Sequence, residues 1–228
     1  MKIAKEDKLP FLLMLITAAA VLIMAIIFRQ NFFYTLPLFI SMVVSFLHSR
    51  ANSYAYLIGG LNSVLYAIVY LVYGVYAQAL QCLIFSLPLQ IMTFIRWNRH
   101  SYKHTTEFRS LSKKQLLFTG LGFLAIWGTL YVVLTIMGSN YIFIDITSTL
   151  IGILATFLSL FAFVEYAFGL FLSNVLALIL HISMTIDSPE QITYVVFSIY
   201  AVFCSCKEVL FVGNTLKEQR AIIGDKKS

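Results

Sequence analysis

Side-chain amides interrupt the apolar stretches of this sequence, and they define the chemistry that the chain could perform. Asn62 and Asn174 each lie near the middle of an apolar run, and Gln90 lies in a third run. Amides both donate and accept hydrogen bonds, and polar groups in lipid are costly unless they pair or serve a function. They either join neighbouring helices or bind a polar solute. Their recurrence beside aromatic residues favours a polar-lined cavity inside a helix bundle.

Two further side chains share helix faces with these amides. Tyr66 follows Asn62 by one helical turn, so the two side chains lie on one face. His181 lies two turns beyond Asn174, on nearly the same face. A single histidine in such a helix is more typical of a satisfied helix–helix contact than of a proton relay.

The carboxylates indicate how a solute would move. Those of the apolar regions lie at or near the ends of these regions, and Glu208 lies beside Lys207, whose charge could offset its own. A proton- or sodium-coupled carrier usually needs a central carboxylate. We therefore expect uncoupled movement of a neutral or weakly charged solute.

The motifs of common membrane enzymes are missing from the sequence. It has no Walker motif, no HExxH, no GxSxG and no paired intramembrane aspartates. Cys82, Cys204 and Cys206 lie in apolar runs without a CxxC pair, and we expect them to be small buried residues. The sequence predicts neither an enzyme nor a metal site nor a cofactor.

Composition places these residues in a membrane. Hydrophobic residues make up 60% of the chain, charged residues 11%, and the mean hydropathy is +0.88, whereas soluble domains carry about 25% charged residues. The apolar runs are roughly 15–23 residues long, which suits helices that cross a hydrocarbon core about 30 Å thick. We predict an all-α integral membrane protein with about eight transmembrane helices. The predicted helices are Phe11–Phe28, Phe32–Leu47, Tyr54–Tyr73, Tyr76–Ile95, Leu116–Ile136, Ile142–Val164, Tyr166–Ile186 and Ile192–Val212.

Basic residues orient the predicted helices. With eight helices and a cytoplasmic start, Lys and Arg fall almost entirely in segments on the inside, while Arg29 lies outside and Lys207 within the last helix. The positive-inside rule then places both termini in the cytoplasm of a multi-pass cell-membrane protein. The polar loop Arg96–Gln115 is expected to be a solvated cytoplasmic loop without a role in nucleic-acid binding.

Two ordered sets of residues carry a family resemblance. The stretch Asn52–Asn98 contains, in order, Tyr54, Tyr56, Gly59, Leu65-Tyr66, Gly74-Val75-Tyr76-Ala77, Gln90 and Trp97. In the second half Asp145 opens one predicted helix, and Glu165 precedes Asn174 in the next. Over most of Asn52–Val212 the chain resembles the PnuC family of vitamin transporters, whose known members carry nicotinamide riboside.

The resemblance implies two parallel three-helix repeats joined by a linking helix, with one extra N-terminal helix, as in the SWEET-like fold. Internal repeats of this kind are an established plan for transporters. The implied divisions are residues 1–30 for the tail and extra helix, 31–98 for the first repeat, 99–137 for the loop and linking helix, 138–214 for the second repeat, and 215–228 for the cytoplasmic tail.

The resemblance also implies a function and a site. Family members are thought to work by facilitated diffusion, with a cytoplasmic kinase that phosphorylates the solute and so traps it. The implied site residues are Asn62, Gln90 and Asn174, which would hydrogen-bond the ribose or base, and Tyr66, Phe94 and Trp97, which would stack on the solute or gate its path.

The sequence departs from the family at three tryptophan positions, which hold Phe94, Ala167 and Leu170. Tryptophan is the best aromatic partner for a cationic ring, and Tyr166 and Phe168 are expected to point elsewhere around the helix. Thiamine, riboflavin or a deoxynucleoside are therefore alternative solutes for the same fold. A membrane enzyme or sensory subunit with a polar cavity is the alternative of another class. The oligomeric state stays open, a homo-oligomer included.

Overall fold

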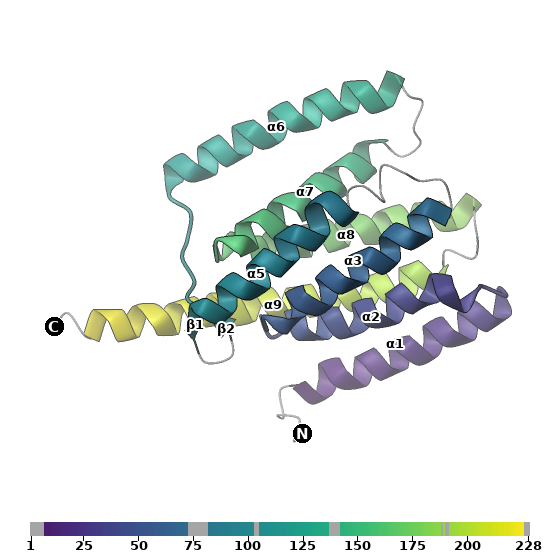
Figure 1. Cartoon of the computed structure of the whole chain (residues 1–228), viewed down its shortest axis with the longest axis horizontal. Helices are drawn as coiled ribbons and strands as arrows, with labels where there is room; N and C mark the ends of the chain where they lie inside the picture. Colours follow the sequence, from purple (N-terminus) through teal and green to yellow (C-terminus); the bar gives the residue numbers. More distant parts are fainter. Residues whose placement is uncertain are drawn as a thin grey trace.

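The protein is a bundle of long helices that run nearly side by side, as its computed structural model shows (Figure 1). The structure describes residues 7–72, 82–102, 105–136, 142–187, 189 and 192–225. The predicted Gly74–Ala77 turn lies outside these residues. The described helices are α1 (Lys8–Ile27), α2 (Phe32–His48), α3 (Tyr54–Val72), the π-helical turn η2 (Cys82–Ser86), α5 (Leu87–Arg99), α6 (Lys113–Ile136), α7 (Ile142–Leu160), α8 (Glu165–Asp187) and α9 (Ile192–Asp225).

Local chemistry explains where several helices begin. Asn31 caps α2 because its side chain accepts a hydrogen bond from the Phe33 N–H at 2.9 Å. Pro88 lies in the first turn of α5, where its missing N–H costs no helical hydrogen bond. Pro37 lies inside α2, and such a proline is tolerated where neighbouring helices supply partners for the backbone.

The all-α membrane architecture is confirmed. Four of the described helices are long and apolar enough to cross a membrane, over Lys8–Ile27, Lys113–Val132, Glu165–Ile186 and Ile192–Ile222. The other apolar helices carry shorter stretches of this kind, over Thr35–His48, Tyr54–Ile68 and Ile146–Leu160.

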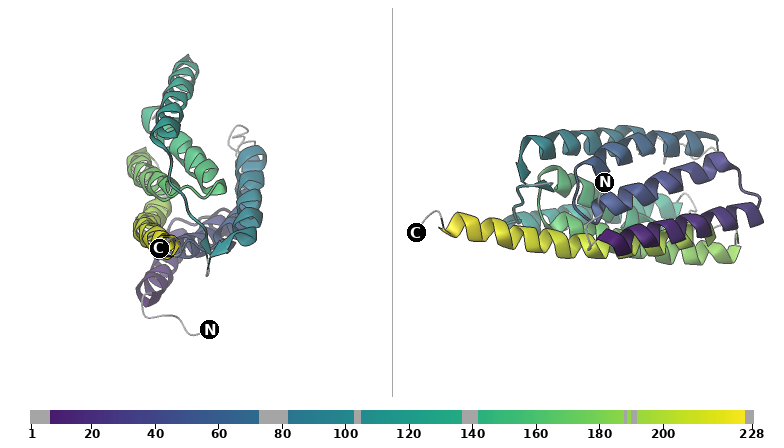
Figure 2. Two further views of the ribbon diagram at one scale, coloured as in Figure 1. Left: turned by 90° about the vertical axis from the view of Figure 1, so that its left-hand side faces the viewer. Right: turned by 90° about the horizontal axis from the view of Figure 1, so that it is seen from below.

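Two predicted boundaries are wrong. The helix expected to reach Val164 ends at Leu160, because a tight turn follows in which Ala162 adopts a left-handed φ of 57°. The last helix continues well past Val212 to Asp225. Its extension is polar, and it projects beyond the end of the bundle (Figures 1 and 2).

The helices pack in the order that two three-helix units would give. Helices α2, α3 and α5 contact one another in sequence, and so do α7, α8 and α9. The two groups meet through α2 against α9 and α5 against α7. Helix α6 packs on α7 at one edge, and α1 packs on α2 and α9 at the opposite edge (Figures 1 and 2). The parallel repeat relationship itself stays a prediction.

Small residues bring α7 and α8 close together. A Cβ at Gly169 would lie 3.1 Å from the Cβ of Ala155. Ser148 and Ser173 exchange hydrogen bonds, each hydroxyl donating to the other residue's carbonyl at 3.2 and 3.0 Å. In lipid, where apolar burial gives no advantage, close backbone approach and interhelical hydrogen bonds hold helices together.

An ion-pair cluster ties three helices at the end of the bundle where α1 begins. Asp7 accepts a hydrogen bond from Lys207 Nζ at 3.0 Å and pairs with Arg50 through its other oxygen. The side chain of Asp7 is only 6% exposed, so it joins the start of α1 to the end of α2 and to α9. Lys207, which the sequence suggested as an offset for the charge of its neighbour Glu208, thus forms an ion pair with Asp7.

The loop between α5 and α6 is packed against the bundle, which corrects the expectation of a solvated loop. It contains a small antiparallel pair, β1 (Ser101–Tyr102) and β2 (Thr105–Thr106). Phe108 is 8% exposed and belongs to a core cluster at this end of the bundle. Arg109 donates its N–H to the Ala162 carbonyl, and its own carbonyl accepts from Val164.

Gln219, in the projecting part of α9, fastens this loop. Its Oε1 accepts from the Phe108 N–H at 2.9 Å, and its Nε2 donates to the Thr106 carbonyl at 3.0 Å. The extension of α9 thus supplies partners for backbone groups that are buried with the loop. This contact explains why the last helix continues beyond the apolar stretch.

We expect Gln219→Ala to lower the free energy of unfolding in detergent by about 1–3 kcal/mol, because it strands a buried N–H and a buried carbonyl. Asn214→Ala is the matched control, since Asn214 is an exposed amide on the same helix. Denaturant titration followed by Trp fluorescence measures both variants. Equal stability of the two variants would show that Gln219 does not fasten the loop.

Candidate functional site

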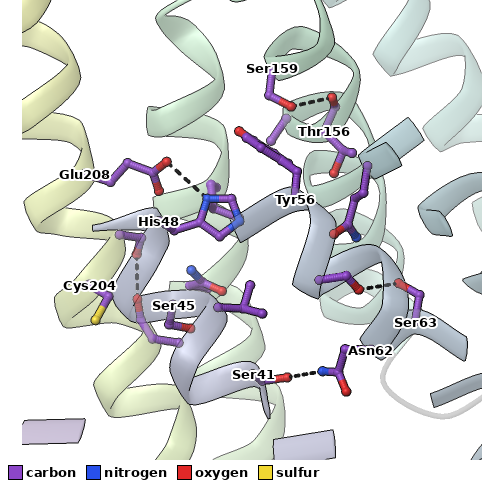
Figure 3. Close-up of a pocket in the computed structure, with 18 of the residues that line it drawn as sticks. Ser41, Ser45, His48, Tyr56, Asn62, Ser63, Thr156, Ser159, Cys204 and Glu208 are labelled. Carbon is purple, nitrogen blue, oxygen red and sulfur yellow. Dashed lines mark hydrogen bonds and ion pairs between the residues drawn. The ribbon is translucent and has the colours of Figure 1, made fainter. Parts of the chain in front are cut away.

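A polar cavity of about 240 Å³ lies inside the bundle. Helices α2, α3, α5, α7, α8 and α9 all contribute to its wall, so both groups of three helices enclose it. In Figure 3, hydrogen bonds or ion pairs join Asn62 to Ser41 and His48 to Glu208 across helices, whereas Ser63 and Ser159 bond within their own helices. The serines and threonine of the wall are Ser41, Ser45, Ser63, Thr156, Ser159 and Ser205.

Asn62 and Tyr66, two of the residues singled out from the sequence, line the cavity together. Asn62 Nδ2 donates to Ser41 Oγ at 2.9 Å and to the Pro37 carbonyl at 3.0 Å. The Tyr66 hydroxyl lies 3.2 Å from the same Ser41 oxygen. Both amide hydrogens of Asn62 therefore join α3 to α2, while its buried Oδ1 has no hydrogen-bond partner in the described structure.

Gln90 and Asn174 also line the cavity, from α5 and α8. Unlike Asn62, neither side chain makes a hydrogen bond within the described part of the chain. Gly59 makes room for Gln90, because a Cβ at position 59 would collide with the Gln90 amide oxygen. These two amides lie at the cavity wall with hydrogen-bonding groups that no described residue uses, which distinguishes them from amides that only join helices.

Trp97 and Phe94 do not line the cavity. Trp97 is fully buried, and its Nε1 donates to the Ser159 carbonyl at 2.7 Å. Its ring packs edge-on against Tyr56, with ring centroids 4.9 Å apart, and against Tyr166 at 5.7 Å. Trp97 therefore lies behind two tyrosines that face the cavity.

Phe94 packs with the exposed Tyr54, with ring centroids 5.4 Å apart. The sequence gives the helix on which each aromatic residue lies. The side of that helix that meets the cavity depends on how the bundle packs.

Tyr166 lines the cavity, so the expectation that it points elsewhere is wrong. Leu170, one turn later, also lines it, whereas Ala167 is buried in the core cluster with Trp97. Of these two positions, only 170 therefore bears directly on a solute. Phe168 is 60% exposed on the outer face of the helix.

A carboxylate that was not among the predicted site residues forms part of the cavity wall. Glu208 on α9 is fully buried. Its Oε1 accepts a hydrogen bond from the Tyr166 hydroxyl at 2.7 Å and lies 3.3 Å from His48 Nδ1 (Figure 3). His48 also meets the ring of Tyr56 edge-on, with centroids 4.9 Å apart. Sequence reasoning missed this group of four side chains.

A signal for Glu208 was present in the sequence. The wall residues of α9 follow one helical face, which consists of apolar or small residues before it reaches the carboxylate. They are Phe197, Ala201, Cys204, Ser205 and Glu208. Following this face would have placed Glu208 on the inner side of the helix.

The remaining candidates lie outside the cavity. His181 Nδ1 lies 2.8 Å from the Ser198 hydroxyl and joins α8 to α9, as the prediction of a helix–helix contact requires. Among the described residues, His, Cys, Asp and Glu form no group of three or more that could hold a metal ion.

Comparison with known proteins decides the family. The family model for the nicotinamide mononucleotide transporters matches residues 32–207. The chain belongs to this family. As the resemblance predicted, this member of the family is a multi-pass membrane transporter and not an enzyme.

A solved structure shares the fold of this family member. It is the crystal structure of the vitamin B3 transporter PnuC, with a TM-score of 0.76 and 15% sequence identity. The match covers 95% of this chain and 94% of the other. No curated protein matches the chain.

We expect Tyr166→Phe to lower the free energy of unfolding by about 1.5–3 kcal/mol, because it removes a hydrogen bond to a buried carboxylate. Tyr54→Phe is the control, since Tyr54 is 55% exposed on the bundle surface. Denaturant titration in detergent compares the two variants. An unchanged stability of Tyr166→Phe would show that Glu208 does not depend on this donor.

Proposed function

We propose that the protein carries nicotinamide riboside across the cell membrane by facilitated diffusion. The observation that carries the proposal is the set of uncommitted polar groups at the cavity wall. Gln90 and Asn174 make no side-chain hydrogen bond in the described structure, and Asn62 Oδ1 has no partner there. Asn62 Oδ1 is buried, and a buried polar atom without a partner is costly. A ligand that completes the hydrogen bonds of the three amides is the simplest reason for their placement at one wall.

The charge of the wall favours a nucleoside over a nucleotide. Of the residues described as lining the cavity, none is Lys or Arg, and Glu208 is a carboxylate. Phosphate groups are bound by Arg, Lys or helix N-termini. A phosphorylated solute would meet none of these side chains and would face a like charge.

The wall also matches the two ends of a nucleoside. Ribose hydroxyls both donate and accept hydrogen bonds, and so do the amides of Gln90, Asn62 and Asn174. Tyr66 and Phe197 bring aromatic rings to the same wall for a planar base. In this proposal Tyr66 stacks on the base, and Trp97 holds the tyrosines in place from behind.

The same lack of Lys and Arg among the described wall residues supports trapping of the solute inside the cell. A cytoplasmic kinase that phosphorylates nicotinamide riboside adds a negative charge, and the described wall residues offer no Lys or Arg to bind it. The product is then retained, and net uptake continues. Lys8 at the start of α1, Arg50 after α2 and the loop after α5 lie toward one end of the bundle (Figure 1), which supports a cytoplasmic location for this end and for both termini.

Isothermal titration calorimetry of the detergent-purified protein tests the choice of solute. The panel is nicotinamide riboside, thiamine, riboflavin, thymidine and deoxyadenosine. Saturable binding of nicotinamide riboside is expected. Binding of one of the other solutes alone would replace nicotinamide riboside in the proposal and leave the transporter family unchanged.

We expect Asn174→Ala to lower uptake of nicotinamide riboside about tenfold or more without lowering the yield of folded protein, because the solute loses a hydrogen bond to the cavity wall. Ser183→Ala is the control on the same helix, since that hydroxyl donates to the Ile179 carbonyl outside the cavity. Radiolabelled uptake in proteoliposomes measures both. Wild-type uptake by Asn174→Ala would contradict the proposed site.

Facilitated diffusion predicts that a pH gradient does not drive uptake. The sequence favoured uncoupled movement because its carboxylates were expected near the ends of the apolar regions, but Glu208 lies in the cavity wall. Transport measurements therefore have to test for proton coupling directly. At a clamped membrane potential of zero, we expect proteoliposomes to fill only to the outside concentration, with or without a pH gradient. Enclosing a nicotinamide riboside kinase with ATP should raise the accumulated label. Accumulation driven by the pH gradient alone would show proton coupling.

A further inference from the structure

We infer that Glu208 forms a cation subsite in the cavity wall and selects solutes that carry a positive charge. This inference rests on the proposed transport function and specifies the charge of the solute. It assigns a recognition role to a side chain that neither the amide pattern nor the predicted site included.

Only one of the two Glu208 carboxylate oxygens has hydrogen-bond partners in the described structure. Oε1 accepts from the Tyr166 hydroxyl at 2.7 Å and lies 3.3 Å from His48 Nδ1. Oε2 is buried and has no hydrogen-bond partner in the described structure. A carboxylate offers about four acceptor positions, so a donor or a cation is missing on one side.

The other groups around Glu208 do not cancel its charge permanently. The ion pair that the described residues provide for it is with His48, which is charged only when it is protonated. Tyr56 and Tyr166 are neutral hydroxyl-bearing rings, and Cys204 lies one turn away on α9. Lys207, the nearest lysine in sequence, pairs with Asp7.

The burial of Glu208 indicates that its carboxylate needs a further partner. Taking a carboxylate out of water is costly unless a partner compensates it. The attraction between opposite charges is also stronger in a region of low dielectric constant than in water. A cationic solute in the cavity supplies the missing partner, and the wall residues that the structure describes include no Lys or Arg that would repel it.

A matched pair of solutes isolates the role of charge. Nicotinamide riboside carries a pyridinium cation, and its dihydro form has nearly the same shape but a neutral ring. Glu208→Gln keeps the size of the side chain and an oxygen that accepts from Tyr166. Calorimetry should show that this variant binds nicotinamide riboside on the order of tenfold to a hundredfold more weakly, while its affinity for the dihydro form is unchanged.

Glu165→Gln is the matched control. Glu165 is another carboxylate with one oxygen bonded, to the Leu111 N–H at 3.0 Å, and the other buried without a partner. It does not line the cavity, so this variant should bind both solutes as the wild type does. Thermal unfolding of both variants checks that each is folded.

Each other outcome is decisive. Unchanged binding of nicotinamide riboside by Glu208→Gln would overturn the subsite and leave the proposed function standing. An equal loss for both solutes would show that Glu208 only shapes the wall, which also overturns it. If the wild type binds no nicotinamide riboside, the proposed solute fails, and thiamine against thymidine becomes the cation–neutral pair. A wild-type protein that binds no cation overturns the subsite as well.

Discussion

Polar atoms inside this bundle depend on partners within the protein, because the surrounding lipid offers none. Much of the interior obeys this constraint directly. Asn62 bonds α2, Ser148 and Ser173 bond each other, and Trp97 bonds the Ser159 carbonyl. These contacts fix the spacing and rotation of the helices. Against this background the cavity is exceptional, since several of its polar groups lack partners in the described structure.

The packing of the loop after α5 follows from the same constraint. Phe108 of this loop joins an aromatic cluster with Trp97, Tyr56 and Tyr166. The loop can pack there only because its backbone groups find partners, in Gln219 on one side and in the α7–α8 turn on the other. The loop is therefore part of the packed end of the bundle and not a solvated connection.

The sequence predicted most of the fold, because long apolar runs and basic termini are direct consequences of the membrane. It also predicted the amides of the cavity, since a polar side chain in an apolar run is visible without any structure. It failed for Glu208, which was paired with its neighbour Lys207. Adjacent residues on a helix point about 100° apart, so Lys207 reaches Asp7 while Glu208 faces inward. The burial of Trp97 and of Phe108 depended on packing between distant segments, which no local pattern encodes.

Helix α9 makes two of the contacts described above, Glu208 with Tyr166 and Gln219 with the loop after α5. Glu208 and Gln219 lie about three helical turns apart, so they project from the same side of the helix. A rotation of α9 that withdraws Glu208 from Tyr166 also withdraws Gln219 from the loop. Exposure of the carboxylate and release of the loop after α5 would then occur together.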